Sequence, residues 1–186
     1  KNKSVGRKFL VAGDGGFNLT HSESINELIQ RYTPTGFLRE ALLSFSNTDV
    51  QAWFKGIGIP TFIGSSKRVY PEEGIKPIEV LNAILTKLRQ QSVNIKYEHK
   101  WVGWNMDNQP LFDNGEALET GYTIFVLGGG SWKVTGSDGS WFSQFKDNEI
   151  GVENFHPSNC AHEVVWDNIF IDKYEGQPLK NIAITC

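Results

Sequence analysis

The chain has 186 residues, of which 39% are hydrophobic and 12% aromatic, and its net charge at pH 7 is −3. This length suits one domain or one and a half, and the composition excludes an intrinsically disordered class of protein. The 18 Lys and Arg residues are scattered, which argues against a nucleic-acid surface, and no apolar run reaches the roughly 18 residues that a membrane span needs. Two cysteines, Cys160 and Cys186, make no disulfide framework and favour a reducing, cytoplasmic compartment.

The first predicted element is a short buried strand over residues 9–12, with the sequence FLVA. Arg7 and Lys8 precede it, and a glycine-rich turn follows at residues 13–18. Cationic side chains beside a loop rich in backbone N–H groups suit a phosphate or pyrophosphate group. An ordinary turn beside a solvated cationic pair explains the same residues, and at this point both interpretations stand.

Three helices and a hairpin are expected next. The residues THSE at 20–23 match a capping box, in which a Ser or Thr and an acid three positions later satisfy the first N–H groups of a helix. Asn47 is a favourable helix N-cap, and Gly56 or Gly58 would end the helix that it begins. The expected helices cover residues 20–32, 35–45 and 47–55, and the expected hairpin strands cover residues 61–63 and 68–70.

The clearest helix is predicted over residues 77–91. Its apolar residues step by three and four positions, and Pro77 fits the first turn of a helix. Short strands separated by turn-forming residues follow, and they predict an antiparallel β-meander. Those strands are expected at residues 93–97, 101–104, 109–112 and 116–119.

The stretch at residues 122–139, YTIFVLGGGSWKVTGSDG, is the centre of the predicted fold. Residues 122–127 carry no charge and predict a strand buried on both faces. Gly128, Gly129 and Gly130 follow, and bare backbone after a buried strand allows a ligand to come close. A strand with a flexible exit loop is the alternative for these glycines. A short helix over residues 140–146 and a β-like tail over residues 163–186 complete the chain.

Together these elements predict an α/β fold. The strand at residues 122–127 is expected to lie centrally, between the strand at 9–12 and the helix at 77–91. His156, Cys160 and His162 have a spacing that suits a metal, but no fourth ligand accompanies them, so we expect a turn with an incidental thiol and no metal site.

Four stretches, in chain order, resemble motifs of bacterial NAD(P)/FAD-dependent oxidoreductases of the aminoacetone-oxidase-like family. These stretches are GRKFLVAGDGGFNLTH at residues 6–21, SKRVYP at 66–71, TIFVLGGGSWKVTGSDG at 123–139 and FHPS at 155–158. The chain departs from the family pattern where an Arg-Cys pair is replaced by Gly16 and Phe17, and where a final Asn is replaced by His21. These departures bear on the contacts at the isoalloxazine side of the flavin.

The resemblance implies an incomplete Rossmann-type FAD/NAD(P)-binding α/β domain over residues 1–160 and the start of a β-barrel-like insertion domain over residues 161–186. It also implies a set of cofactor-binding residues on three segments. These are Arg7, Lys8, Gly15, Gly16 and Asn18 near the flavin or its pyrophosphate, Val102 meeting the adenine side through its backbone, and Gly128, Gly129 and Gly130 passing close to the cofactor.

The function that the resemblance implies is FAD-dependent oxidation or reduction, with NAD(P)H as a candidate electron donor and the substrate open. Proteins of this family open with a strand, a GxGxxG turn and a helix, and that unit does not precede Lys1. We therefore expect a middle fragment that is inactive alone and binds FAD weakly or not at all. The alternative is a cofactor-free α/β structural or protein-interaction module that uses exposed aromatic residues.

Overall fold

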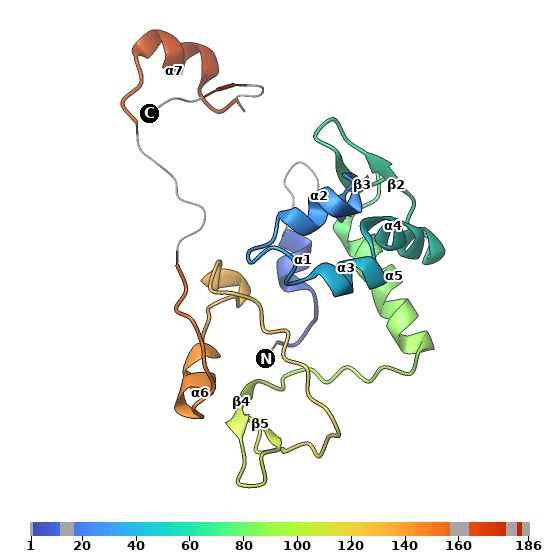
Figure 1. Cartoon of the computed structure of the whole chain (residues 1–186), viewed down its shortest axis with the longest axis vertical. Helices are drawn as coiled ribbons and strands as arrows, with labels where there is room; N and C mark the ends of the chain where they lie inside the picture. The colour runs from blue at the N-terminus through green and yellow to red at the C-terminus, as the bar shows by residue number, and fades with distance from the viewer. Residues whose placement is uncertain (1, 12–16, 157–163, 178–181, 184–186) are drawn as a thin grey trace. The chain divides into compact units, whose positions relative to one another are not determined.

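A computed structural model of the chain describes residues 2–11, 17–156, 164–177 and 182–183 (Figure 1). The chain divides into two compact units, Lys1–Val152 and Glu153–Cys186. The first unit is a mixed α/β structure with small antiparallel sheets, one of three strands and one of two.

The chain enters a helix, not a strand, after its first residues. Helix α1 covers Arg7–Val11, so the strand expected at residues 9–12 is wrong over its described residues. A run of four apolar residues fits a strand or a helix equally well, and here the helical hydrogen bonds can form within the segment itself. Gly6 has a φ of +74°, and a Cβ there would lie 2.5 Å from Leu81 Cδ2 of helix α5 (Pro77–Gln90). Glycine at this position therefore lets α1 lie directly against α5.

Two capping boxes set the starts of α2 (Ile25–Gln30) and α4 (Asn47–Gly56). The Ser24 hydroxyl accepts from the Glu27 amide while the Glu27 carboxylate accepts from the Ser24 amide, and Ser46 and Asp49 repeat the arrangement. The box expected at residues 20–23 is wrong, since Thr20–His21 forms strand β1 instead. Between these helices, α3 covers Arg39–Ser44, a shorter helix than the one expected over residues 35–45.

The predicted hairpin is confirmed. Strands β2 (Thr61–Ile63) and β3 (Arg68–Pro71) pair antiparallel, and β1 joins the other edge of β3, which gives the sheet order β1-β3-β2. Val69 at the centre of β3 has no exposed surface. The small core of this unit therefore forms where the sheet meets its helices.

The long helix is also confirmed, as α5 (Pro77–Gln90). Val80 and Leu81 are buried, at 0% and 8% exposed, whereas Ile78 is 44% exposed. The buried side of the helix is thus centred on Val80 and Leu81.

Of the expected β-meander, the described residues form one hairpin and one isolated bridge. Strands β4 (Trp101–Trp104) and β5 (Pro110–Phe112) pair antiparallel with a bulge at Val102, and Leu111 forms a single bridge with Ala117. The strand expected at residues 93–97 is wrong, and the strand at 116–119 forms only that bridge.

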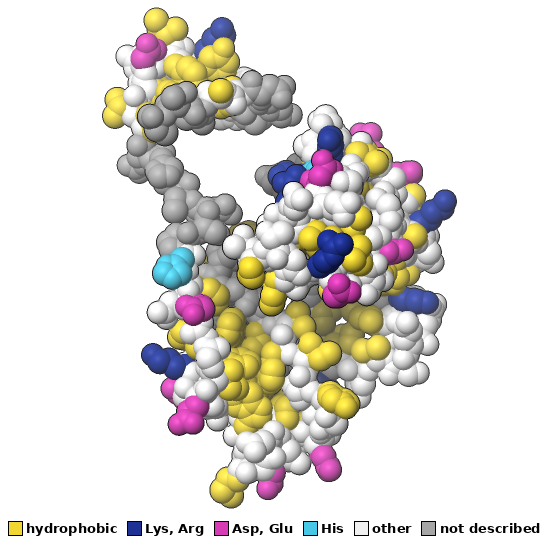
Figure 2. Space-filling view, viewed as in Figure 1, with side chains coloured by type: hydrophobic (Ala, Val, Ile, Leu, Met, Phe, Trp, Pro, Cys, Tyr) yellow, Lys and Arg dark blue, Asp and Glu magenta, His cyan; other side chains and the backbone are white. Residues whose placement is uncertain are grey.

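The strand expected at residues 122–127 is also wrong. Tyr122, Ile124 and Val126 are 96%, 86% and 88% exposed, and these residues run as irregular chain. A buried strand needs neighbouring strands on its edges, and no described backbone group pairs with these residues. Phe125 alone turns inward, to the rings of β4 and of helix α6 (Phe142–Asp147). Figure 2 shows hydrophobic side chains gathered over this part of the molecule.

The second unit contains a helix where a β-like tail was expected. Helix α7 covers Asn168–Tyr174, and the Asp167 carboxylate caps it by accepting from the Phe170 amide. Trp166, Phe170 and Tyr174 stand four positions apart, and successive ring centroids lie 4.6 and 4.9 Å from each other. Contacts at this spacing favour a helix over a strand. The start of a β-barrel-like insertion is not confirmed.

Candidate functional site

Lys8 reaches from α1 to the loop that follows residues 122–127. Its ammonium group donates hydrogen bonds to the hydroxyls of Ser131 and Ser137, at 3.0 and 3.4 Å. Ser137 is buried, whereas Lys8 is largely exposed. The structure thus places Lys8, one of the predicted binding residues, beside the loop that carries Gly128, Gly129 and Gly130.

The glycine loop, residues 128–130, is fixed through its carbonyl groups. The Ser137 hydroxyl donates to the Gly129 carbonyl at 2.8 Å, and the Trp141 indole N–H donates to the Gly128 carbonyl at 2.9 Å. Within the described part of the chain, the amides of the three glycines donate no hydrogen bond. Backbone N–H groups without a partner and a cationic side chain are group types that bind phosphate oxygens in proteins.

A tight turn positions Ser137 against the glycine loop. The backbones of Trp132 and Ser137 exchange hydrogen bonds of 3.1 and 3.2 Å across the short helix η1 (Lys133–Thr135). The Thr135 hydroxyl donates to the Trp132 carbonyl, and Gly136 closes the turn with a φ of +90°. This hydrogen bonding holds the Ser137 hydroxyl at a fixed place between Gly129 and Lys8.

The Val102 cavity lies beside this loop and has a volume of about 340 Å³. Its wall combines β4, the end of the irregular segment and the turn before α6. The lining residues are His99, Lys100, Trp101, Val102, Phe112, Leu127, Gly136, Asp138, Ser140, Trp141 and Gln144. Apolar and aromatic walls with a few polar groups are typical of a small-molecule site.

A cluster of aromatic rings supports the wall of the Val102 cavity. Trp101 lies 4.8 Å from both Trp104 and Phe125, and Phe145 of α6 lies 5.1 Å from Phe125. The Trp101 indole N–H is a buried side-chain donor with no acceptor among the described residues. A buried donor without a partner costs about 1–3 kcal/mol.

The rim of the cavity carries an ionic group. The Glu116 carboxylate bonds the Lys96 ammonium and also His99 Nε2, at 2.9 Å for the latter, while His99 Nδ1 faces the Tyr97 carbonyl. The Tyr97 carbonyl and then the Glu116 carboxylate raise the pKa of His99 above its ordinary value. The Lys96 ammonium and then His99 lower the pKa of Glu116 to about 2. These shifts favour a protonated imidazole at the rim.

The other predicted site residues lie apart from this arrangement or outside the described part of the chain. Arg7 is exposed on α1, and neighbouring helix positions point in different directions, so it does not share the Lys8 contacts. Asn18 is exposed just before β1. Gly15 and Gly16 lie outside the described residues.

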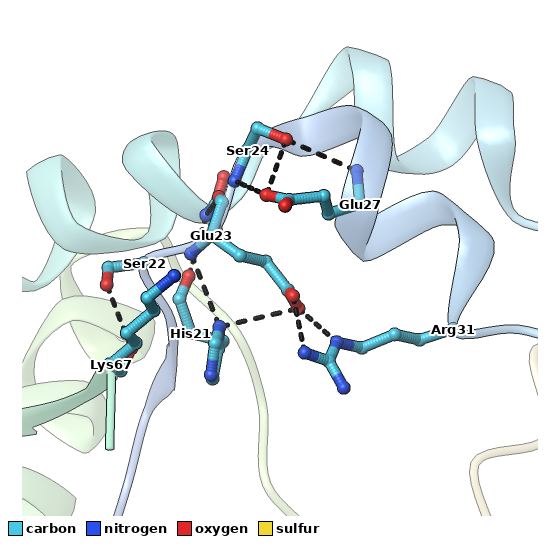
Figure 3. Close-up of polar contacts among 8 residues, drawn as sticks. His21, Ser22, Glu23, Ser24, Glu27, Arg31 and Lys67 are labelled. Carbon is cyan, nitrogen blue, oxygen red and sulfur yellow. Dashed lines mark hydrogen bonds and ion pairs between the residues drawn. The ribbon is translucent and has the colours of Figure 1, made fainter.

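A separate polar cluster contains His21, Glu23 and Arg31 (Figure 3), and Asn47 links it to α4. The Glu23 side chain, only 5% exposed, accepts from Nε and Nη2 of Arg31, and His21 Nδ1 lies 3.4 Å from the same carboxylate. The buried Asn47 amide donates to the carbonyls of His21 and Glu23, at 2.6 and 2.8 Å. The polar groups of this cluster are paired with one another, which is typical of a cluster that stabilises the fold.

Two further expectations concern metals and membranes. Within the described ranges, no three metal-binding side chains come together, and Cys160 and His162 fall outside those ranges. No helix in the described part of the chain has the length and apolar character needed to cross a membrane.

Sequence reasoning missed Ser131, Ser137 and His99 as site residues. Both serines stand inside the motif at residues 123–139, at its GGxS and TGS positions, so the motif itself was a usable signal. His99 had no such signal, because its role depends on Glu116, which lies 17 positions away.

A protein-family model described as HI0933-like protein Rossmann domain matches residues 1–157. No curated protein matches the chain significantly.

Proposed function

The chain belongs to the HI0933-like family of Rossmann-domain proteins, a family of FAD-binding oxidoreductases, and from this premise we propose that residues 1–157 form part of an FAD site. In this proposal the chain contributes to flavin-dependent oxidation or reduction of a substrate that is still to be identified.

The contact between Lys8 and the glycine loop carries the proposal. A phosphate group at this position would meet the Lys8 charge, the Ser131 and Ser137 hydroxyls and the amides of the glycine loop. These are the group types that bind phosphate in proteins. We therefore assign the FAD pyrophosphate to this place.

The Val102 cavity supports the adenine side of the proposal. Its aromatic walls, which include Trp101 and Trp141, suit a flat ring. Its volume of about 340 Å³ is at the lower end of ligand pockets, which span about 300–1,000 Å³. It therefore suits one part of a dinucleotide, and we expect the chain to hold FAD weakly.

Arg7, Gly15, Gly16 and Asn18 enter the proposal through the resemblance in sequence. FAD supplies the transfer of electrons or hydride when it is bound, and the protein supplies position and electrostatics. Lys8 would neutralise phosphate charge, and the glycine loop would let the cofactor approach the backbone. NAD(P)H is the electron donor that we propose.

We also propose that residues 1–160 are the partial FAD-binding domain and that residues 161–186 begin an insertion domain. The family match, which ends at residue 157, supports this division.

Titration of the chain with FAD and with riboflavin tests the function. Riboflavin lacks both the phosphates and the adenine, so FAD should bind at least about tenfold more tightly, since each 1.4 kcal/mol is tenfold in affinity. Flavin absorbance between about 350 and 500 nm and flavin fluorescence report the binding. Equal affinity for FAD and riboflavin would show that Lys8 and the Val102 cavity do not contribute to flavin binding. No binding at about 1 mM FAD would argue against a flavin site in this chain.

A cofactor-free interaction module remains the second candidate. The exposed side chains of Tyr122, Ile124 and Val126 favour it, because solvent-exposed apolar residues in a group often mark a protein contact. The FAD titration distinguishes the two candidates, because only the flavin-site proposal expects FAD to bind.

A further inference from the structure

A second cavity lies on the three-stranded sheet. This Tyr70 cavity has a volume of about 380 Å³. It shares no lining residue with the Val102 cavity. Its wall consists of Phe17, Phe62, Tyr70, Pro71, Glu72, Glu73, Gly74 and Ile75.

Local geometry holds three aromatic rings in this wall. Phe62 and Tyr70 are directly opposite each other on β2 and β3, and their rings stack with centroids 5.8 Å apart. A Cβ at Gly64 would come within 2.9 Å of the Tyr70 ring, so glycine there leaves room for that ring. Phe17 is held from behind by Phe9, with ring centroids 5.0 Å apart. The rings are therefore placed by contacts that exist without a ligand.

The charge of the wall is negative. Glu72 and Glu73 both line the cavity, and among the described residues no Lys, Arg or His side chain does so. Neither glutamate forms an ion pair with any other described residue. Two backbone hydrogen bonds fix their segment, from Glu72 N to Pro60 O and from Ile75 N to Glu72 O. An anionic ligand such as a phosphate would be repelled here.

We propose that the Tyr70 cavity binds a small alkylated ammonium ion. Aromatic faces attract a cation that has apolar substituents, by about 0.5–2 kcal/mol, and nearby carboxylates add charge attraction. A strongly hydrated ion such as Na⁺ gains little from rings, and a neutral ligand gains little from the carboxylates. Rings and carboxylates in one cavity therefore select a ligand that is both cationic and apolar.

Two other roles for the same rings are distinguishable. The Phe62–Tyr70 pair also stabilises the sheet as a cross-strand pair, which requires no ligand. A neutral flat ring, such as that of a flavin, would stack on Tyr70 but would not need Glu72 or Glu73. The test therefore compares ligands that differ in charge alone.

Choline and 3,3-dimethylbutan-1-ol form a matched pair, because the second carries a carbon in place of the charged nitrogen. Both are titrated into the full 186-residue chain at constant ionic strength, with NaCl as the ionic control, and amide shifts are followed by NMR. We expect choline to shift the amides of residues 72–75 and to bind at least about fivefold more tightly than the alcohol.

Two variants test the wall. Phe62→Leu removes one ring, and a Glu72→Gln/Glu73→Gln double variant removes the charge while it keeps every ring. Both should weaken choline binding at least about threefold, whereas the controls Phe37→Leu and Glu119→Gln should leave it unchanged. If Phe62→Leu does not fold, the double variant decides, because its substitutions are isosteric and exposed. Equal affinity for choline and the alcohol, shifts elsewhere in the chain, or unchanged binding by the double variant would overturn the proposal. Tighter binding of lumiflavin than of choline in the Tyr70 cavity would also overturn the proposal.

Discussion

The Lys8 ammonium lies 3.0 Å from the Ser131 hydroxyl, although 123 positions separate the two residues in sequence. This contact joins the first helix of the chain to the loop at residues 128–139. Together the two segments supply a charge, two hydroxyls and backbone amides, which are the group types that bind phosphate.

Replacing Lys8 by Met should weaken FAD binding about tenfold. The substitution removes one charged donor, and hydrogen bonds to charged groups contribute about 1.5–3 kcal/mol. The loss should shrink at high salt, because salt screens the charge at this exposed position. Flavin fluorescence titrations at low and high salt measure both effects. Lys55→Met on α4 is the matched control, and an equal loss in that variant would contradict a local role for Lys8.

Gly128→Ala should destabilise the chain by about 1 kcal/mol. Gly128 has a φ of +72°, and a side chain in this left-handed region costs about 1–2 kcal/mol. Gly56→Ala is the control, because Gly56 lies within α4 with open space around it and should be neutral or stabilising. Chemical denaturation of the two variants measures the difference. Equal stability of both variants would show that the Gly128 backbone relaxes freely.

Val69→Ala should cost about 2 kcal/mol of unfolding free energy, and Val126→Ala should cost less than about 0.5. The same two methyl groups are removed in each case, but Val69 is fully buried and Val126 is 88% exposed. Denaturant unfolding of both variants checks the prediction. A large loss in Val126→Ala would mean that residues 122–127 are buried in solution.

Glu116→Gln should lower the pKa of His99 toward its ordinary value of 6.5, because it removes a carboxylate that His99 bonds. A raised His99 pKa contributes stability below pH 6.5 that is lost as the pH rises through the folded value. The lowered Glu116 pKa contributes stability above its ordinary 4.5 that is lost as the pH falls toward about 2. The variant should therefore differ most from the parent between pH 4.5 and 6.5.

NMR titration of the His99 ring protons measures that pKa directly, and thermal melting across the same pH range measures the stability. Glu119→Gln is the control, since Glu119 is exposed and should leave the His99 titration unchanged. An identical titration curve in Glu116→Gln would show that the ion pair does not form in solution.

The parts of the fold that the sequence predicted correctly are those set by local interactions. Helix α5 follows from an apolar period and a first-turn proline, and the β2–β3 hairpin follows from two β-prone runs around a turn. The apolar run at residues 9–11 was misassigned because so short a run has no period to distinguish strand from helix.

The strand at residues 122–127 failed for a different reason. An uncharged β-prone sequence specifies a strand only when another strand supplies its hydrogen bonds, and that partner is not a property of the segment. In the candidate site, too, local sequence features could be predicted and contacts between distant segments could not. Gly128 and Lys8 were predicted as binding residues from the sequence, whereas the pairing of Lys8 with Ser131 and Ser137 depends on how distant segments meet.

The exposed side chains of Tyr122, Ile124 and Val126 also have a consequence for the chain at high concentration. Segments with free backbone groups and β-prone side chains are templates for edge-to-edge pairing between molecules. Self-association should therefore begin here and grow with concentration. A single charge placed by Val126→Lys should raise the solubility limit and leave the melting temperature unchanged, because that side chain is already in water.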